Sequence, residues 1–173
     1  MTYLNACVLE STRLHPPLIF LMRKALADIE VDVLGNKYVV PKGDIMVACP
    51  AAGQRLPEGK FSPFKRPMSY EPERFLAPRS EHQNSDFKLS YIGFGHGTHK
   101  CRGMKFGELQ VKTIISTVLR QFEMSYPSDK LPEACYESLV VPPKKEQTVV
   151  HYKRRQPAAA TGGGASGAVP SSE

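Results

Sequence analysis

The stretch FGHGTHKCRG, from Phe94 to Gly103, decides the fold of this chain. It places Cys101 in a loop punctuated by glycines, directly before a long segment with the pattern of an amphipathic helix. Because they lack a Cβ, Gly97 and Gly103 can adopt a positive φ or let the backbone approach a flat group closely. The unpaired amides and the positive dipole end of the following helix favour a thiolate at Cys101. We therefore interpret the loop as a cradle for an ionised sulfur.

An ionised sulfur beneath a flat surface is what a thiolate ligand to haem iron requires. Read as F-x-x-G-x-x-x-C-x-G, the stretch resembles the haem-binding signature of the cytochrome P-450 superfamily. The resemblance implies that Cys101 is the axial ligand of the iron in haem b, with Phe94, Gly97 and Gly103 at the other fixed positions. It also implies that His99 bonds a haem propionate, where arginine is commoner. The alternative for Cys101 is a buried free cysteine.

A second motif lies near the beginning of the chain. Glu10 and Arg13 are three residues apart in a segment without helix breakers, so they share one helix face, and Pro16–Pro17 then end the helix. Taken alone, such a pair is usually a surface ion pair worth less than about 1 kcal/mol. In the resembled superfamily, however, an E-x-x-R motif pairs with a later arginine, which would be Arg74 of the stretch EPERF. We expect a structural triad of Glu10, Arg13 and Arg74.

The composition is that of a globular protein. Of the 173 residues, 41% are hydrophobic and 23% are charged, and no apolar run approaches the roughly 20 residues that a membrane helix needs. No signal peptide pattern is present. The four cysteines are scattered without a C-x-x-C pair, which argues against a zinc site or a disulfide framework and favours a reducing compartment. The net charge of +6 is spread along the chain, so we predict no nucleic-acid partner.

The pattern of apolar residues predicts the order of the elements. A helix over 2–13 precedes strands at 18–25, 29–33, 38–40 and 45–49, and the segment 50–84 has the prolines and glycines of an irregular meander. After Gly103 an apolar stripe predicts a long buried helix, and 139–141 with 148–152 predict a terminal β-hairpin around two prolines.

These elements match an α+β, mostly helical cytochrome P-450 fold. The resemblance covers residues 1 to about 153, which correspond to the C-terminal third of such an enzyme. We therefore expect residues 1–155 to form the C-terminal haem-binding part of a cytochrome P-450 domain, with a helix, a small β-sheet, a long meander, the haem-thiolate loop, a long helix and a terminal β-hairpin. Residues 156–173 are rich in Ala, Gly, Ser and Pro, so we expect a disordered low-complexity tail.

Within the superfamily, the chain is most similar to the eukaryotic sterol 14α-demethylases. The stretches PPLIFLMR, YVVPKGD and GMKFGELQVKTI carry this resemblance. It implies that Arg23 bonds a haem propionate and that five apolar residues contact the substrate: Leu18, Phe20, Met22, Leu139 and Val140. The alternative for these five residues is simple strand packing. The chain departs from the family at Thr98, at Arg102 and at 53–55, where an arginine, an aliphatic residue and a histidine are expected, and these departures weaken the sterol assignment.

Basic residues surround the cysteine loop and the first turns of the next helix: Lys100, Arg102, Lys105 and Lys112. In the resembled superfamily this face docks an acidic electron donor, cytochrome P-450 reductase, which draws its electrons from NADPH. The alternative is an ordinary basic surface.

The resemblance implies a monooxygenase that uses dioxygen to remove the sterol 14α-methyl group, a step of sterol biosynthesis. It also implies the endoplasmic reticulum membrane, reached through an N-terminal anchor outside this sequence, so the chain by itself is expected in the cytoplasm. Two alternatives stay open. One is a monooxygenase acting on another lipid or on a xenobiotic, and the other is a truncated, non-catalytic fragment that binds haem or packs against a partner.

Overall fold

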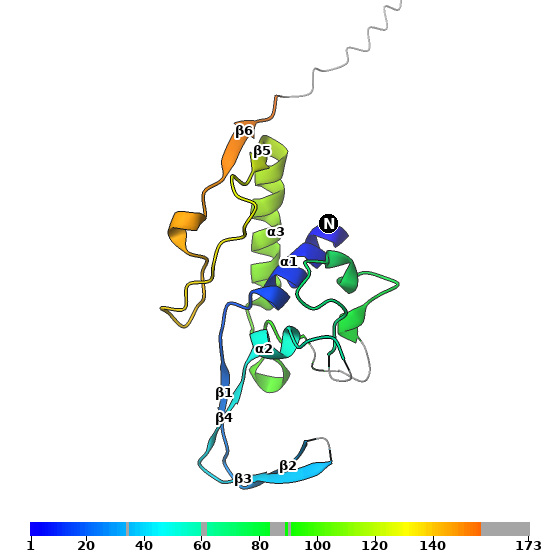
Figure 1. Ribbon diagram of the computed structural model, residues 1–173, viewed down its shortest axis with the longest axis vertical. Helices are drawn as coiled ribbons and strands as arrows, with labels where there is room; N and C mark the ends of the chain where they lie inside the picture. Colours follow the sequence, from blue (N-terminus) through cyan, green and yellow to red (C-terminus); the bar gives the residue numbers. More distant parts are fainter. Residues whose placement is uncertain (34, 60–61, 84–88, 90, 157–173) are drawn as a thin grey trace, which may run out of the picture.

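The computed structural model describes residues 1–33, 35–59, 62–83, 89 and 91–156. A long helix, α3 (Met104–Gln121), is crossed by the N-terminal helix α1 (Thr2–Leu14), as Figure 1 shows. The segment that follows α2 (Pro50–Gln54) lies on one side of these helices, and the segment before the last strand lies on the other. Apart from Gln156, the predicted tail at 156–173 lies outside the described residues.

Helix α1 confirms the predicted first helix and ends where the sequence requires. Pro16 and Pro17 have no backbone N–H to continue the helical bonds, and the amide of His15 makes the last of them, to the carbonyl of Ser11 at 2.8 Å. One face of the helix is buried and carries Ala6, Glu10, Arg13 and Leu14. Because two of these four residues are charged, the interior that this face meets is partly ionic.

The predicted strands form small sheets. Strand β1 (Leu21–Lys24) pairs antiparallel with β4 (Ile45–Ala48), and β2 (Ile29–Val33) pairs with β3 (Asn36–Val40). At the turn between β2 and β3, Gly35 has a φ of 84° and its amide donates to the carboxylate of Asp32 at 2.8 Å. The predicted strand at 18–25 begins later, at Leu21, because Leu18 instead makes an isolated bridge to Val140.

Among its described residues, the predicted meander contains three short helical segments: α2, η1 (Pro72–Phe75) and η2 (Glu81–Gln83). Pro50 and Pro72 stand in the first turns of α2 and η1, where a missing N–H costs nothing. The meander also supplies the aromatic part of a small core, in which Phe64 and Phe75 pack with Ala6 of α1. The core therefore lies between α1 and the meander.

The predicted burial of α3 is wrong for the described chain. No residue of α3 is buried, and Val111, Ile114, Ile115 and Leu119 of its apolar stripe are 40–53% exposed. Helix α1 and strand β5 (Phe122–Ser125) pack against α3, and they cover only part of the stripe. The amphipathic pattern correctly predicted a helix, but burial also requires a partner surface. Among the described residues, no helix is both long enough and apolar enough to cross a membrane.

The predicted pairing at the end of the chain is also wrong. A terminal antiparallel pair exists, but β6 (His151–Arg154) pairs with β5, which directly follows α3. The segment 139–141 pairs elsewhere, since Val140 bridges Leu18 and the amide of Val141 donates to the carbonyl of Pro17 at 2.9 Å. The short helix η5 (Lys145–Gln147) separates that segment from β6. The two segments that we expected to pair with each other thus each find a partner more than 25 residues away.

Candidate functional site

The predicted triad forms a buried charge cluster between α1 and η1. Glu10, Arg13 and Arg74 are all 0% exposed. Arg13 donates from Nε to Glu10 Oε2 at 2.7 Å and from Nη2 to Glu10 Oε1 at 2.9 Å, and Arg74 donates from Nε to Glu10 Oε1 at 3.0 Å. The backbone amide of Glu71 donates to Glu10 Oε1 at 2.8 Å as well. One carboxylate therefore joins the helix to the meander.

The remaining guanidinium hydrogens of the cluster bind backbone carbonyls of the meander. Arg13 donates to the carbonyl of Gln54 at 2.8 Å, and Arg74 donates to that of Lys65 at 2.7 Å. Both arginines donate to the carbonyl of Ser69, at 3.3 and 3.2 Å. Buried charges are tolerated only when they are paired and their donors are satisfied, and this set of bonds meets that condition.

Glu81 supplies a second negative charge that sequence analysis missed. Its Oε2 accepts from Arg74 Nη1 at 2.7 Å, so that the two buried arginines face two carboxylates. Arg79 then bridges Glu81 and Glu71 at the edge of the cluster. Desolvation acts to raise the pKa of Glu71, but the hydrogen bond from Arg79 and the charges of the neighbouring arginines outweigh it and lower that pKa.

Phe64 closes the cluster on one side. Its ring centroid lies 5.0 Å from Cζ of Arg13 and 5.7 Å from Cζ of Arg74, within the range of cation–π attraction. The ring is 1% exposed, so it also keeps water from the ion pairs. Phe64 lies between the two motifs and belongs to no periodic or motif pattern, so the sequence alone offered no reason to select it.

The residues just before the predicted cysteine loop are bound to α1, η1 and α2. Tyr91 packs edge-on against Phe75 with ring centroids 5.4 Å apart, and its hydroxyl shares a hydrogen bond with Thr12 of α1. The next amide, that of Ile92, donates to the side chain of Gln54 at 2.9 Å. Tyr91 and Gln54 were not among the residues predicted from the sequence.

The loop itself is a tight turn around Cys101. Gly95 and Gly97 have φ values of 71° and 69°, where only glycine fits without strain. The amide of Cys101 donates to the carbonyl of Phe94 at 2.8 Å, which closes the turn, and the short helix η4 (Gly97–His99) lies within it. Gly103 has an ordinary φ of −81°, and a Cβ there would come within 3.9 Å of the Cys101 sulfur. This distance is an ordinary van der Waals contact, so the space beside the sulfur does not by itself require glycine at position 103.

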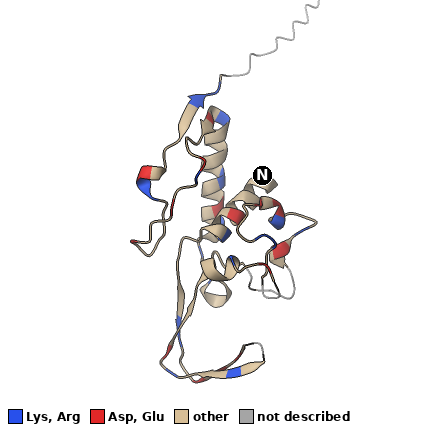
Figure 2. Cartoon of the chain, viewed as in Figure 1, with Lys and Arg blue, Asp and Glu red and all other residues tan. Residues whose placement is uncertain are grey.

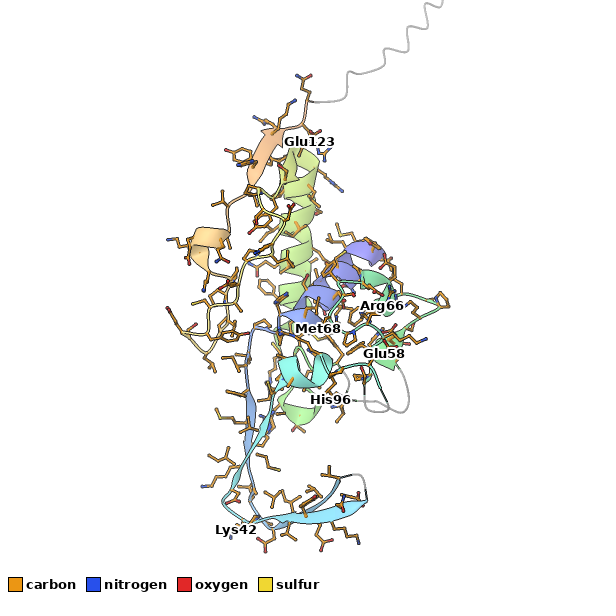
Figure 3. The ribbon with its side chains drawn as sticks, viewed as in Figure 1. Lys42, Glu58, Arg66, Met68, His96 and Glu123 are labelled. Atoms are coloured by element: carbon orange, nitrogen blue, oxygen red, sulfur yellow. The ribbon has the colours of Figure 1, made fainter. Side chains whose placement is uncertain are left out.

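Cys101 is a free, exposed thiol. It lies just before the N-terminus of α3, and Figure 3 places His96 of the loop and Glu123 near opposite ends of that helix. The helix dipole favours a negative charge at this end. Because the sulfur is accessible and unpaired, it can bind a metal ion or a haem group.

The other predicted site residues lie on several elements. The backbone bridge brings Leu18 and Val140 together, and all five apolar residues predicted to contact a substrate are exposed. Arg23 lies on β1 and donates to the carbonyl of the adjacent Met22 at 2.7 Å. The predicted roles of these residues toward a substrate or a propionate stay predictions.

The basic residues around the loop divide into two kinds. Lys100, Arg102 and Lys105 are exposed, whereas Lys112 is half-buried and donates to the side chain of Asn5 on α1 at 3.0 Å. Lys112 therefore joins α3 to α1, and this bond makes its ammonium group less available to a partner protein. Figure 2 shows basic and acidic residues spread over most elements of the chain.

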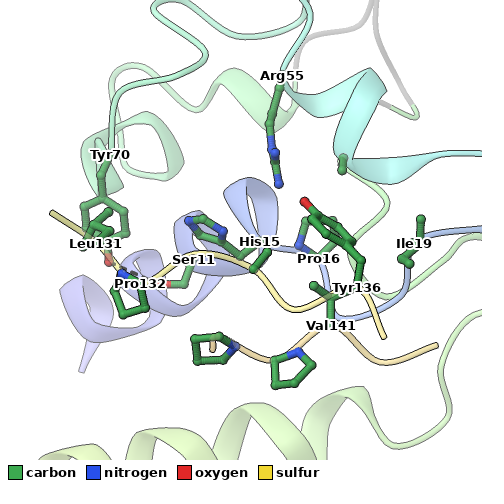
Figure 4. A pocket seen from close by; sticks show the side chains of 14 residues that line it. Ser11, His15, Pro16, Ile19, Arg55, Tyr70, Leu131, Pro132, Tyr136 and Val141 are labelled. Atoms are coloured by element: carbon green, nitrogen blue, oxygen red, sulfur yellow. Dashed lines mark hydrogen bonds between the residues drawn. The ribbon is translucent and has the colours of Figure 1, made fainter. Parts of the chain in front are cut away.

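A separate pocket of about 640 Å³ lies between the end of α1 and the segment 131–143, as Figure 4 shows. Its lining is mostly apolar, and Arg55 extends into it. Desolvation and the positive charges of Arg55 and Arg13 lower the pKa of His15, which also lines the pocket. None of the lining residues belongs to the cysteine loop, so this pocket is distinct from the surface around Cys101.

Comparison with known proteins identifies the relatives of this chain. The family model described as Cytochrome P450 matches residues 1–150. A sterol 14-demethylase of Arabidopsis thaliana is 43% identical over 82% of this chain, and an obtusifoliol 14-alpha demethylase of Triticum aestivum is 42% identical over the same share. The chain spans 28% and 30% of the lengths of these two relatives.

The solved structures agree on the fold. The structure of a retinoic acid-bound cyanobacterial CYP120A1 matches 90% of this chain and 34% of its own, with a TM-score of 0.74 and 23% sequence identity. The haem domain of a cytochrome P450DA mutant matches 89% of this chain and 31% of its own, with a TM-score of 0.72. The expected fold class is confirmed, with the strand pairing corrected above.

Removing one arginine of the charge cluster tests its structural role. We expect Arg74→Met to lower the free energy of unfolding by about 3–5 kcal/mol, because it leaves the Glu10 carboxylate buried without one of its partners. The matched control is Arg66→Met, whose side chain is 69% exposed and which we expect to change stability by about 0.5 kcal/mol or less. Denaturant unfolding measures both changes. Equal effects of the two substitutions would contradict a buried structural triad.

The raised pKa of Tyr91 predicts that the protein loses stability at alkaline pH. Desolvation raises the pKa of Tyr91 from 10.0 to about 12. The folded state therefore holds this proton more tightly than the unfolded state, so the stabilisation is complete below pH 10 and is lost as the pH rises toward 12. We expect Tyr91→Phe to reduce this slope of unfolding free energy against pH.

Comparing the pH dependence of the unfolding free energy between the wild type and Tyr91→Phe separates the contribution of Tyr91 from that of the other tyrosines. The hydrogen bond to Glu73 raises the pKa of Tyr3, and desolvation raises that of Tyr70, so both contribute to the slope of the wild type and of the variant. The variant also loses the bond to Thr12, which costs about 1 kcal/mol at every pH below the transition. Identical slopes for the two proteins would contradict the assignment.

Proposed function

The chain belongs to the cytochrome P450 family, and from this premise we propose that it forms the haem-thiolate part of a sterol 14α-demethylase. The observation that carries this proposal is the 43% identity to a sterol 14-demethylase over 82% of the chain. A free thiol at Cys101, on a loop tied to a buried charge cluster, supports it. Because the chain spans less than a third of its relatives' lengths, the activity belongs to a complete domain of this kind.

The residues of the loop fit a haem group. Cys101 offers an exposed, free sulfur, and the positive φ values of Gly95 and Gly97 make a tight turn in the chain just before it. A Cβ on Gly97 would meet no atom within 4 Å, so the surface there is open. We propose that Cys101 holds the iron and that the side chains of His99 and Arg23 donate hydrogen bonds to the propionates.

Each part of the chain then has a role in the reaction. Haem, when bound, would supply the activation of dioxygen, which electron donation from a thiolate ligand favours. The loop holds Cys101 in place through the hydrogen bond from its amide to the carbonyl of Phe94, directly before the N-terminal end of α3. The exposed side chains of Lys100, Arg102 and Lys105 would steer an acidic reductase that carries electrons from NADPH.

The apolar residues predicted to contact a sterol come from two distant segments. The bridge between Leu18 and Val140 brings the residues just before β1 next to the segment 139–141. This proximity supports a shared role of the two segments at one wall of a cavity. Phe20, Met22 and Leu139 are exposed here and are available to that wall. Apolar side chains of this kind bind a sterol ring system by excluding water.

Replacing the sulfur with oxygen tests the ligand assignment. We expect the chain, expressed with haem, reduced and exposed to carbon monoxide, to give the red-shifted absorption band of a thiolate-bound iron. Cys101→Ser should lose this band, because an alcohol is a far weaker donor to iron than a thiolate. Cys135→Ser is the matched control, since Cys135 is also a free thiol but lies outside the loop. A band that survives Cys101→Ser would overturn the proposal.

A chimaera tests the substrate. This chain, joined in place of the corresponding segment of the Arabidopsis thaliana relative, completes the domain. We expect a sterol with a 14α-methyl group to shift the absorption spectrum of the haem-loaded chimaera, and we expect Leu139→Asp to weaken that binding about tenfold or more, because it places a charge against an apolar ligand. If only non-sterol compounds shift the spectrum, the chain serves a monooxygenase with another substrate.

A further inference from the structure

We propose that Gln54 is a positioning residue that fixes the cysteine loop to helix α1, an inference that goes further than the proposed role of Cys101 and rests on it. Gln54 is the last residue of α2 and is 1% exposed. Its side chain joins two backbone groups from distant parts of the chain. Nε2 donates to the carbonyl of Arg13 at 3.0 Å, and Oε1 accepts from the amide of Ile92 at 2.9 Å.

The carbonyl of Arg13 needs this bond because of the sequence that follows it. In a continuing helix this carbonyl would accept from the amide four residues later, but that residue is Pro17, which has no N–H. A buried carbonyl left without a donor is costly. Gln54 therefore completes the end of α1 at the point where the two prolines interrupt it.

The amide of Ile92 has a similar need at the start of the loop. Ile92 lies outside the helices and strands, and its amide finds its partner in Oε1 of Gln54. The same residue's carbonyl accepts from the amide of Gly95 at 2.9 Å, and the carbonyl of Phe94 accepts from the amide of Cys101 at 2.8 Å. A short path of backbone hydrogen bonds thus leads from Gln54 through the turn to Cys101.

Gln54 and the charge cluster join different segments of the chain. Glu10, Arg13 and Arg74 bind one another and the backbone between Gln54 and Glu71, which fixes the meander to α1. Arg13 Nη1 also holds the backbone carbonyl of Gln54 at 2.8 Å, so the cluster fixes α2 as well. The Gln54 carboxamide then extends this frame to the loop, since it reaches Ile92 directly. Its donor and its acceptor are both used, which an apolar side chain of the same size cannot reproduce.

Hydrogen exchange in the full chain tests this link without haem. We expect Gln54→Leu to speed exchange of the Ile92 amide by about tenfold or more relative to the amide of Gly107, because Ile92 loses its acceptor and Gly107 keeps its bond to Gly103 within α3. Gln110→Leu, on the exposed side of α3, is the matched control and should change neither amide. Equal acceleration of both amides in Gln54→Leu would overturn the proposal, since it indicates a general loss of stability.

Gln54→Met covers a failure of the leucine variant to fold, because methionine is unbranched like glutamine and places no charge at this buried position. Methionine offers no amide oxygen to Ile92, so we expect the Ile92 amide to lose protection relative to Gly107 in this variant as well. Unchanged protection of Ile92 in Gln54→Met would overturn the assignment of Oε1 as the anchor of the loop.

The carbon monoxide spectrum separates this inference from the proposed function. In haem-loaded protein, we expect Gln54→Leu to lower the fraction of the red-shifted thiolate band at unchanged haem content, because the sulfur is displaced. If the wild type shows the band and Gln54→Leu keeps both the band and the protection of Ile92, the positioning role fails and the proposed function stands. If the wild type lacks the band while Ile92 responds as expected, the proposed function fails and the anchor of the loop stands.

Discussion

The structure depends on one buried carboxylate, that of Glu10. It accepts hydrogen bonds from two arginines that are 61 residues apart and from the backbone amide of Glu71. Taking such charges out of water costs several kcal/mol per ion, so the arrangement is stable only because every group has a partner. Glu81 balances the second arginine, and backbone carbonyls of the meander accept the other guanidinium hydrogens. These carbonyls belong to a segment with little secondary structure, which explains how an irregular stretch holds a defined path.

The same frame determines where the cysteine loop lies. Tyr91 and Ile92 attach the start of the loop to α1 and α2, and the turn at Gly95 and Gly97 then brings Cys101 to the end of α3. None of these contacts involves the sulfur itself. Buried polar bonds fix the surroundings of Cys101, because the hydrophobic core among the described residues is small.

The chain exposes large apolar surfaces and covers less than a third of the length of two of its relatives. The apolar stripe of α3 and the apolar residues near β1 have few partners among the described residues, and the chain covers 28–30% of two sterol demethylases. The described chain is thus best understood as one part of a cytochrome P450 domain.

The sequence alone determined the local features of this protein. The spacing around Cys101, the Glu10–Arg13 motif, the end of α1 at two prolines and the alternation in β2 and β3 were all readable, because each depends on backbone preferences within a few residues. Tertiary structure decided the rest. Gln54 reaches residues 38 and 41 positions away, Glu81 and Phe64 join a cluster that begins on α1, and β6 pairs with β5 in place of the segment 139–141. No local pattern specifies such partners, because each contact joins residues that lie far apart in the sequence. For Gln54 and Arg74 the partners are selected by the need to satisfy buried polar groups, and that requires the chain to be packed.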